Sequence, residues 1–566
     1  MLGCWKARKL EDVKGQKASG FLAFKPASLL AVSFFTFHFS LFTPLLAFDR
    51  TNVPLKNWGG FAIQRSWVYD ALEKVVLAGL AEQVIFNTKP LNRVEAARIV
   101  AQAVERLQGD QYGDYNHRGY LEELLYRLVE EFGPELTEMG VRTPLNPETL
   151  AGFFKLHPVD HLQFGSPFST KKQQVFNHLG ERVAKGGNLE PTADGRVQIG
   201  DYVSLYYQPQ FSLSQDGYRG RLLNGYGKFR LWNTELEVGR DSLWFGPGFR
   251  GSMSFSNNAL PLNQVRLSSA EPFRLPWLLR YLGPTKLTAF AIQLEDNRDF
   301  PKAKIGGWRI NIAPSKYTEF GFTRVFQFGG RGRGTLKPWQ FLQLFVDQGS
   351  DTGGPTQVNN LMSLDATVRW PDARRYIYIA RDLSLYGELG WDDTLDPGFR
   401  FLFFPTGAII PHKPGGIVGI LLAGVLGDPK LDLRFEYAKT TDIQFTHGIY
   451  TSGFTHKGAV LSHFIGTDGD DRYVRLTRWM SPDLLLGFQA GKSHIGATPA
   501  SLQTTPLSDQ LSVGFDVSYR ILPTSSLFFG YDFTRARTEN RNNAADKGPA
   551  KINHLLRFEY TRSFDR

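Results

Sequence analysis

The stretch QLSVGFDVSYRI, residues 510–521, alternates apolar and polar side chains along its whole length. The apolar positions are Leu511, Val513, Phe515, Val517, Tyr519 and Ile521, and the positions between them are Ser512, Gly514, Asp516, Ser518 and Arg520. Successive side chains of a β-strand point to opposite faces, so this pattern predicts a strand with one apolar and one polar face. The same period of two recurs at 431–437 and 552–564 and holds from about Gly195 to the C-terminus. This part of the chain is therefore predicted to be all β.

The polar faces of these strands carry charged residues at mid-strand, and aromatic residues make up 14% of the chain, with 45 Phe and 21 Tyr. A membrane β-barrel turns its apolar face to lipid and its polar face to the lumen, and it places aromatic residues at both interfaces. A soluble sandwich is expected to show more frequent tight turns and fewer aromatic residues at strand ends. We therefore predict a mainly β protein, with a large transmembrane antiparallel β-barrel over residues 196–566.

The barrel segment is long enough for 16 to 18 strands, at roughly 20 residues per strand with its share of turns. An even number of strands places both ends of the barrel segment on the periplasmic side. A barrel of that size has a lumen wide enough to conduct solutes unless another part of the protein fills it.

Between Trp67 and Phe132 the apolar residues recur at helical spacing instead. They form two stripes, Val68, Leu72, Val75, Val76 and Leu80, and Leu121, Leu124, Leu125, Leu128 and Phe132. Asn92 followed by Glu95 resembles a capping pair that opens a further helix. We predict a small periplasmic bundle of at least three helices within residues 48–165, followed by a linker at 166–195. This bundle is our candidate for closing the lumen.

Residues 1–47 have the order of a secretory signal, with a basic region, the apolar run LLAVSFFTFHFSLFTPLLA and a small residue at Ala47. Cleavage after Ala47 would remove Cys4, the one cysteine, and would leave no disulfide in the mature chain. The alternative is an uncleaved membrane anchor, which the polar residues and Pro44 in the run disfavour. Because no later apolar run is long enough for a spanning helix, we expect the outer membrane of a Gram-negative cell as the destination.

A glycine-rich motif raises a different possibility. Residues 243–251, LWFGPGFRG, fit the pattern G-x-G-x-x-G at Gly246, Gly248 and Gly251. A dinucleotide site requires a helix directly after such a loop, because the helix N-terminus binds the pyrophosphate. The residues that follow, SMSFSNNALPLN, show no helical spacing. We therefore interpret the motif as a barrel loop, where the backbone leaves the sheet and enters a crowded lumen.

The order of several segments resembles the capsule assembly Wzi family. These segments are GLAEQVIFNTKPLNRVEAARIV (79–100), LWFGPGFRGSMSFSNNALPLNQVRL (243–267), EPFRLPWLLRYLGPTKLTAFAIQLEDNR (271–298), GWRINIAPSKYTEFGFTRVFQFGG (307–330), YGELGWDD (386–393) and YTSGFTHKGAVLSHFIG (450–466). The resemblance implies an outer-membrane barrel of 18 strands with a periplasmic helical bundle. It also implies a lectin that holds capsular polysaccharide or another exopolysaccharide at the cell surface.

A lectin needs aromatic faces for the CH surfaces of sugars and planar polar groups for their hydroxyls and carboxylates. The segment QFGGRGRGTLKPWQ (327–340) offers such groups, and our candidate ligand-binding residues are Arg331, Arg333, Lys337 and Trp339. The alternatives for this segment are a solvated loop and contact with lipid phosphates. A second set is expected to shape the lumen and to hold the plug or loops, namely Trp244, Gly246, Gly248, Arg250, Asn257, Asn258, Arg266 and Arg274.

Two further clusters of ionisable residues raise the possibility of metal binding and of catalysis. His447, His456 and His463, with Asp468, Asp470 and Asp471, match no zinc or calcium spacing, so we predict no metal and no cofactor. Glu388, Asp392 and Asp393 offer an acid and a base for glycan hydrolysis, but nothing else in the sequence marks a cleft. We predict a protein without enzymatic activity.

The formal net charge of the chain is +10, and part of this excess lies in residues 1–47. The mild excess that remains permits acidic partners without requiring them. We expect capsular polysaccharide or exopolysaccharide, outer-membrane lipids with lipopolysaccharide, and polysaccharide export machinery as partners, and no nucleic acid. The alternative function is an outer-membrane channel or porin for solutes or polysaccharide.

Overall fold

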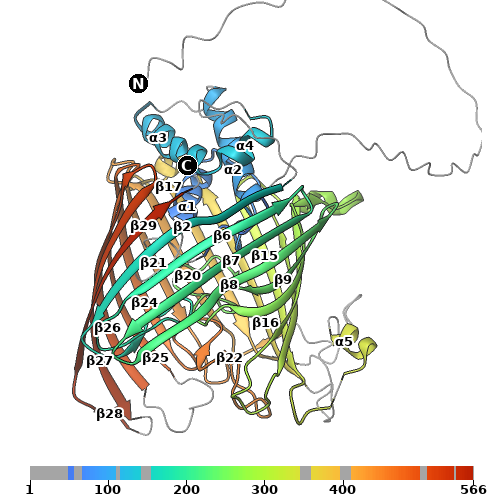
Figure 1. Ribbon diagram of the computed structural model, residues 1–566, viewed down its shortest axis with the longest axis vertical. Coiled ribbons are helices and arrows are strands. Elements are labelled where there is room, and N and C mark those ends of the chain that lie inside the picture. The colour runs from blue at the N-terminus through green and yellow to red at the C-terminus, as the bar shows by residue number, and fades with distance from the viewer. Residues whose placement is uncertain are drawn as a thin grey trace, which may run out of the picture. The chain divides into compact units, whose positions relative to one another are not determined.

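The computed structural model describes residues 49–55, 67–109, 115–141, 154–334, 336–344, 358–395, 410–496, 507–540 and 543–564. These residues belong to one compact unit in which a closed β-barrel follows four N-terminal helices (Figure 1). None of the described helices is long and apolar enough to cross a membrane. The predicted signal sequence, residues 1–47, lies outside the described residues.

The barrel wall consists of 18 antiparallel strands. In chain order they are β2 (Phe154–Ser169), β6 (Glu190–Ile199), β7 (Val203–Ser214), β8 (Gly217–Leu231), β9 (Thr234–Asp241), β11 (Leu262–Ser269), β13 (Pro284–Gln293), β14 (Lys304–Ile312), β15 (Thr318–Phe328), β16 (Asn359–Trp370), β17 (Ala380–Trp391), β20 (Gly415–Val425), β21 (Leu431–Lys439), β24 (Asp470–Ser481), β25 (Leu484–Ile495), β26 (Leu507–Leu522), β27 (Ser525–Asn540) and β29 (Lys551–Ser563). Because β2 pairs with β6 on one side and with β29 on the other, the sheet closes on itself. The predicted fold class is confirmed, with the larger of the expected strand numbers.

Shorter elements lie in the connections between these strands. They are β1 (Thr88–Lys89), β3 (Gln173–Gln174), β4 (Arg182–Val183), β5 (Gly186–Gly187), β10 (Trp244–Phe245), β12 (Phe273–Arg274), η2 (Trp277–Leu282), α5 (Pro338–Leu344), η3 (Ala373–Arg375), β18 (Asp393–Leu395), β19 (Ile410–His412), β22 (Thr455–His456), β23 (Ala459–Val460) and β28 (Asn543–Lys547).

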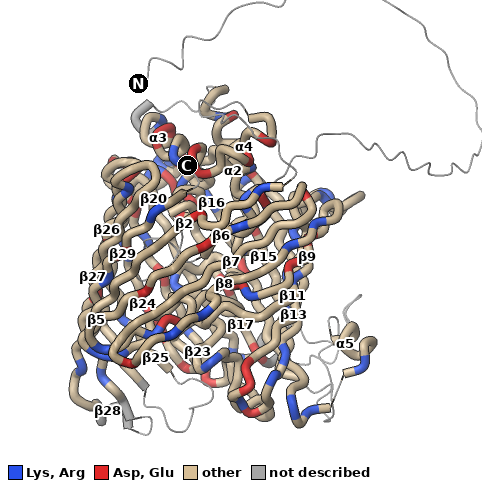
Figure 2. The backbone as a smooth tube through the Cα atoms, in the orientation of Figure 1, with Lys and Arg blue, Asp and Glu red and all other residues tan. Residues whose placement is uncertain are grey.

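The two ends of the barrel differ. One end, called the helical end below, carries the N-terminal helices and the C-terminus, and short turns such as 200–202 and 523–524 join the strands there (Figure 1). The opposite end, called the loop end, carries the long connections, including 242–261 and 440–469. Charged residues gather around the helices and at the loop end (Figure 2).

The alternation read in residues 510–521 separates the two faces of β26. Leu511 and Phe515 are 45% and 41% exposed on the outer face, whereas Asp516 is only 3% exposed inside the barrel. Asp516 accepts two hydrogen bonds from Arg475 of β24, at 2.7 and 2.9 Å. An apolar outer face with charged groups sealed inside is the arrangement of a membrane-type barrel.

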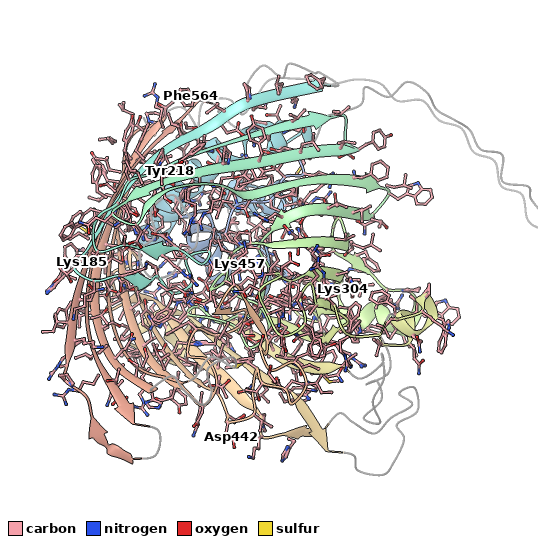
Figure 3. The ribbon with its side chains drawn as sticks, turned by 60° about the horizontal axis from the view of Figure 1, so that its bottom comes forward. Lys185, Tyr218, Lys304, Asp442, Lys457 and Phe564 are labelled. Atoms are coloured by element: carbon pink, nitrogen blue, oxygen red, sulfur yellow. The ribbon has the colours of Figure 1, made fainter. Side chains whose placement is uncertain are left out.

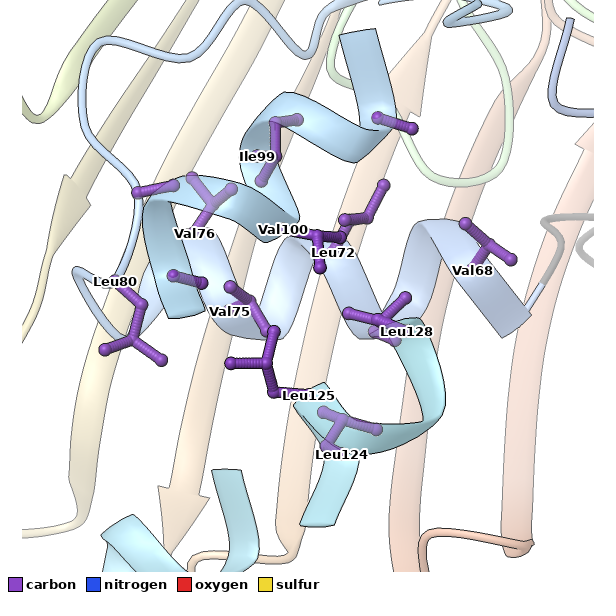
Figure 4. Close-up of a cluster of buried hydrophobic side chains, with 14 of the residues drawn as sticks. Val68, Leu72, Val75, Val76, Leu80, Ile99, Val100, Leu124, Leu125 and Leu128 are labelled. Carbon is purple, nitrogen blue, oxygen red and sulfur yellow. The ribbon is translucent and has the colours of Figure 1, made fainter. Parts of the chain in front are cut away.

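The N-terminal helices are α1 (Trp67–Leu77), α2 (Arg93–Gln108), α3 (Tyr115–Glu131) and α4 (Gly133–Glu138). Both predicted apolar stripes are buried and pack against one another in a common core (Figure 4). The predicted capping pair is also confirmed, because the Asn92 side chain accepts from the Glu95 backbone N–H at 2.8 Å while the Glu95 carboxylate accepts from the Asn92 backbone N–H at 3.1 Å.

The barrel begins earlier in the chain than predicted. Its first strand, β2, starts at Phe154, and β6 starts at Glu190, so the expected boundary at 196 falls inside a wall strand and 166–195 is not a linker. Two prolines, Pro158 and Pro167, interrupt the alternation of β2, and its register with β6 shifts between His157 and His161. A bulged strand of this kind does not show the regular period of two on which the prediction depended.

Candidate functional site

Inward-facing charges of the wall hold an N-terminal segment inside the lumen. Glu319 of β15 accepts hydrogen bonds from the backbone N–H groups of Phe86, at 2.9 Å, and of Asn87, at 2.8 Å. Arg309 of β14 donates to the Asn87 carbonyl at 3.1 Å and pairs with Asp365 of β16 at 2.7 Å, and both members of that pair are fully buried. Buried charges of the barrel are thus satisfied by the backbone that fills it.

The segment from the helices meets a loop that enters from the opposite end. β1 pairs with β10 of the 242–261 loop, with Thr88 opposite Phe245 and Lys89 opposite Trp244. The Gly246 N–H extends this contact by donating to the Asn87 carbonyl at 2.8 Å. Two parts of the chain, 157 positions apart at Thr88 and Phe245, therefore join inside the lumen.

The helices themselves are fixed to the wall through further ion pairs. Glu73 of α1 pairs with Arg434 of β21 at 2.7 Å, and Glu95 of α2 pairs with Lys286 of β13. Three more such pairs are Lys74 with Asp432, Glu130 with Arg520, and Glu138 with Lys155. Glu82, in the connection between α1 and α2, pairs with Lys316 in the turn between β14 and β15. The bundle is therefore attached to strands on several sides of the helical end.

The glycine motif of residues 246–251 lies in this crowded region and forms no nucleotide site. No helix follows it within 242–261, all of which the structure describes. Gly246 has φ +126°, and a side chain there would overlap the Glu388 carboxylate. A side chain at Gly248 would overlap the Gly251 carbonyl oxygen. These glycines therefore allow backbone to pass close to the wall and to itself.

The SNNA segment ties three loops together. The Asn258 side chain donates to the Val460 carbonyl at 2.9 Å and accepts from the Asn177 backbone N–H at 3.2 Å, while the Asn257 carbonyl accepts from the Leu179 N–H at 2.8 Å. Both asparagines are buried, since Asn257 is 1% exposed and Asn258 is 3% exposed. These contacts agree with the structural role expected for the two asparagines, which stays a prediction.

Arg266 and Arg274, which we grouped together, lie in different places. Arg266 is buried in the lumen and pairs with Glu237. Arg274 is not in the lumen: it is exposed in the helical-end connection after β11, where it donates to the Gln83 side chain at 2.7 Å. The correction follows from the position of Arg274 in β12, a two-residue strand that pairs with the first residues of β13 at the helical end, beyond the last residue of β11 at Ser269.

The four candidate ligand-binding residues lie together on the loop that carries α5, beside the loop end (Figure 1). Trp339 is 58% exposed, and Arg331 and Lys337 are also exposed. Arg331 lies 3.7 Å from Asp296, and the Arg333 guanidinium lies 5.6 Å from the ring centres of Phe300 and Tyr450. The loop thus presents an aromatic face and cations to the outside, and its role in binding stays a prediction.

The described carboxylates among the candidates for hydrolysis are hydrogen-bonded to protein groups. Glu388 is buried in the lumen beside Gly246, where Ser252 and Ser254 donate to it at 3.2 and 3.3 Å. Asp392 accepts from the Phe445 backbone N–H. The side chain of Asp393 lies outside the described residues. An acid and a base for glycan hydrolysis must flank a space that admits sugar, and the two described carboxylates face protein groups.

The histidine and aspartate cluster is dispersed. His456 hydrogen-bonds to Glu295 at 2.7 Å, His463 stacks on Phe464, and Asp471 pairs with Arg250 at 2.7 Å. Among the described side chains, no group of three His, Cys, Asp or Glu residues is arranged to hold a metal ion.

A cavity that the sequence did not reveal lies at the loop end. Its volume is about 280 Å³, and its lining includes Arg182, Arg219, Arg221, Arg240 and Lys457. These cations come from β4, β8, β9 and the connection between β22 and β23, so no single segment shows them as a group. The nearest signal in the sequence is YRGRLL at 218–223, a pair of basic residues at the start of a strand.

This barrel is similar to known proteins in sequence and in fold. The model of the capsule assembly protein Wzi family matches residues 160–550. An Escherichia coli outer-membrane protein, described as a carbohydrate-binding β-barrel involved in group 1 capsule assembly, superposes with a TM-score of 0.63 at 19% identity, over 88% of this chain and 99% of that one. OprD of Pseudomonas aeruginosa gives a TM-score of 0.42 at 10% identity, over 72% of this chain and 96% of the other.

An uncharacterised 55.8 kDa protein from the cps region of Klebsiella pneumoniae is 24% identical over 316 residues. The alignment covers 54% of this chain and 53% of that relative, so the chain spans about half the length of the curated relative it matches. The family model covers far more of the sequence, including every wall strand except the start of β2 and the whole of β29. The chain therefore belongs to the capsule assembly protein Wzi family.

Proposed function

We propose that this protein binds a capsular polysaccharide or exopolysaccharide at the loop end of its barrel and retains it at the cell surface. The barrel is an outer-membrane barrel, and in this proposal the loop end faces the outside and the helical end faces the periplasm. Family membership supports the proposal, and so does the description of the E. coli barrel of the same fold as carbohydrate-binding. The asymmetry of the ends also supports it, because outer-membrane barrels have short periplasmic turns and longer outer loops.

The single observation that carries the proposal is the filled lumen. Residues 84–92 enter from the helical end, the 242–261 loop enters from the loop end, and the two pair with each other through β1 and β10. Solute passage through that region would require breaking this pairing and the buried ion pairs around it. A glycan therefore has its accessible binding surface on the outer loops.

The same geometry supports a role without catalysis. Glu388, one of the acidic groups that could be proposed for hydrolysis, is 2% exposed and surrounded by serines and a glycine of the 242–261 loop. A catalytic carboxylate must reach the glycosidic oxygen within hydrogen-bond distance. The buried position of Glu388 does not offer that reach.

Deletion of the gene tests retention directly. We expect the deletion strain to make a normal total amount of polysaccharide and to shed most of it into the medium, with recovery on complementation. The measurement is cell-bound against shed polysaccharide, assayed as uronic acid or total sugar in the cell pellet and the supernatant. Unchanged retention in the deletion strain contradicts the proposal.

The channel alternative is tested with the purified wild-type protein in a planar bilayer. A plugged barrel is expected to give no steady open-pore current, whereas a porin gives stable conductance steps. A steady current from the wild type would favour the channel. In the same preparation, incubation with the host polysaccharide should leave its length unchanged, since shortening would indicate an enzyme.

The α5 loop is our candidate for direct sugar contact, and lipopolysaccharide and export machinery stay predicted partners. Replacing Trp339, 58% exposed, by Ala removes an aromatic face worth roughly 0.5–1.5 kcal/mol in stacking contacts. We expect weaker binding of the host polysaccharide without loss of the folded barrel. Trp232, which is 80% exposed in the turn between β8 and β9 at the helical end, provides the matched control. Equal binding by both variants would remove the α5 loop from the proposed site.

A further inference from the structure

The cavity of about 280 Å³ at the loop end lies between the wall and the loops that fill the lumen. Its wall side comes from β8 and β9, and its inner side comes from residues 180–182, 260–261 and 456–459. Figure 3, which turns the loop end forward, shows Lys457 well inside the ring of wall strands. The volume is close to the lower limit of small-molecule pockets, about 300 Å³. It therefore suits one unit of a longer chain.

The lining of this cavity is basic and contains no Asp or Glu. The complete lining is Gln174, Gly180, Arg182, Arg219, Arg221, Leu222, Leu223, Arg240, Leu260, Pro261, His456, Lys457 and Ala459. The one lining side chain that bonds to an acid is His456, whose partner is Glu295. Arg182, Arg219, Arg221 and Lys457 therefore share one small space. Arg240 borders it from the wall, with its side chain bonded to Asn263 on the outer face of β11.

The partners of these cations in the described part of the chain are neutral. Arg221 donates to the Gln210 side chain at 2.6 and 2.8 Å, and Arg182 donates to the Lys457 carbonyl at 3.0 Å. Arg240 donates to the Asn263 side chain at 3.0 Å and to the Leu222 carbonyl at 3.1 Å. Neutral acceptors satisfy the N–H groups without cancelling the positive charge. Glu181 and Glu190 interact electrostatically with Arg221 and offset part of its charge, while Arg219 and Arg240 repel it.

The rest of the lumen shows a different arrangement. Arg309 pairs with Asp365 at 2.7 Å, and Arg557 pairs with Glu181 at 2.6 Å, each within a fully buried group of residues. Grouped cations without acids repel one another, and the repulsion is largest where water is partly excluded. An anion that enters the cavity relieves this repulsion, so the site is built for a negatively charged ligand.

We propose that this cavity binds a negatively charged substituent of a glycan, a carboxylate or a phosphate carried on a sugar unit. The inference rests on the proposed function and adds to it the chemical class of the ligand and the place where the charged unit sits. Guanidinium groups donate two parallel hydrogen bonds to either anion. Leu222, Leu223 and Leu260 line the same cavity and offer apolar surface to the CH groups of the sugar ring.

Direct binding of the purified host polysaccharide to the full-length protein in detergent tests this site. The main variant is Arg219→Gln with Lys457→Gln, because both side chains are exposed and neither forms a side-chain hydrogen bond or ion pair within the described residues. The second variant is Arg221→Gln, which also loses the bonds to Gln210. The control, Arg374→Gln with Arg375→Gln, removes the same charge from exposed residues at the helical end.

We expect the wild type and the control to bind alike and the main variant to bind about tenfold more weakly or worse, the loss of roughly one charge-assisted contact. The measurement is the dissociation constant by calorimetry, with resistance of the unboiled barrel to SDS as the check on folding. The Arg221→Gln variant should also bind the polysaccharide more weakly than the wild type. Equal affinity of the wild type and both cavity variants overturns the inference.

Two treatments of the polysaccharide identify the anion. Reduction of its carboxylates to alcohols should weaken wild-type binding to the level of the main variant if uronates occupy the cavity, and removal of phosphates with hydrofluoric acid should do so if phosphates do. Undiminished wild-type binding after both treatments overturns the inference while leaving polysaccharide binding in place. A wild type that binds no native polysaccharide at all contradicts the proposed function itself.

Discussion

Glu319 is a wall residue that binds the backbone of the lumen segment 84–92 directly. It is fully buried, and its carboxylate accepts hydrogen bonds from the backbone N–H groups of Phe86 and Asn87 and from Arg369 at 3.0 Å. We predict that Glu319→Ala loosens this segment without opening the barrel wall. The other ion pairs between helices and wall are left intact, so the change is expected to stay local.

The magnitude follows from what the substitution leaves behind. Arg369, 7% exposed, loses its partner, and two backbone N–H groups lose their acceptor. Removing one member of a buried ion pair costs about 3–5 kcal/mol, and each unsatisfied buried group costs about 1–3 kcal/mol. Relaxation and water entry reduce the total, so we take about 3 kcal/mol as the lower estimate. That value corresponds to roughly a 150-fold increase in the open population of the segment.

Amide hydrogen exchange of residues 84–92 in the solubilised full-length protein measures this population. The matched control is Glu82→Ala, which also removes one carboxylate beside the same segment but breaks partly exposed pairs with Lys316 and Arg106. Each such pair is worth about 0–1 kcal/mol, so losing both should make the control exchange less than about thirtyfold faster. Equal exchange rates in the wild type and in a folded Glu319→Ala protein would refute the role assigned to Glu319.

Three further predictions concern other parts of the molecule. Burial alone would raise the pKa of Asp49, but the charges of Arg196 and Arg93 outweigh it and lower the pKa below its ordinary value. The stabilisation from Asp49 is therefore full above about pH 4 and is lost as the pH falls further, so amide exchange of residues 49–55 should rise on acidification and Asp49→Asn should abolish that dependence. Gly246→Ala should destabilise the fold by about 1–3 kcal/mol, because Gly246 has φ +126° and its added carbon would meet Glu388, and the yield of SDS-resistant barrel should therefore fall. Gly448→Ala is the control, because its added carbon meets no atom within 4 Å, and its yield should stay unchanged. Val265→Arg, on the outer face of β11, should lower the free energy of unfolding in lipid vesicles by about 2–4 kcal/mol in urea titrations, and an unchanged midpoint would contradict lipid contact at that position.

The wall strands were predictable from the sequence because lipid and lumen impose opposite requirements on alternate side chains. In β26 the same residues that alternate in the sequence are exposed outside, as Phe515 is, or sealed inside, as Asp516 is. The helices were predictable for a similar reason, since the stripe that contains Leu72 and the stripe that contains Leu124 are buried in one core. In both cases the environment of each residue repeats with the geometry of its own element.

What the sequence did not predict depends on contacts between distant segments. β1 and β10 have two residues each, and only their meeting in the lumen makes them strands. The basic cavity has the same origin, because Arg219 and Lys457 are 238 positions apart and carry no common pattern. The strand β2 was also not predicted, because Pro158 interrupts its alternation after only a few residues. Periodicity reports what one element faces, and it does not report which elements face one another.

The distribution of charge inside the barrel separates structural cations from those available to a ligand. Arg309, Arg266 and Arg434 are held by carboxylates of the wall or of the helices. These groups also hold the N-terminal part of the chain, because Arg309 donates to the Asn87 carbonyl, Glu237 accepts from the Asn52 side chain and Glu73 belongs to α1. An anionic glycan cannot compete for these groups without unpairing a buried acid, which costs several kcal/mol. The cations of the loop-end cavity lack that cost, because their acceptors are amides and carbonyl oxygens. Plugging the barrel and binding an acidic polysaccharide are thus compatible in one lumen, since the first uses the paired arginines and the second uses the unpaired ones.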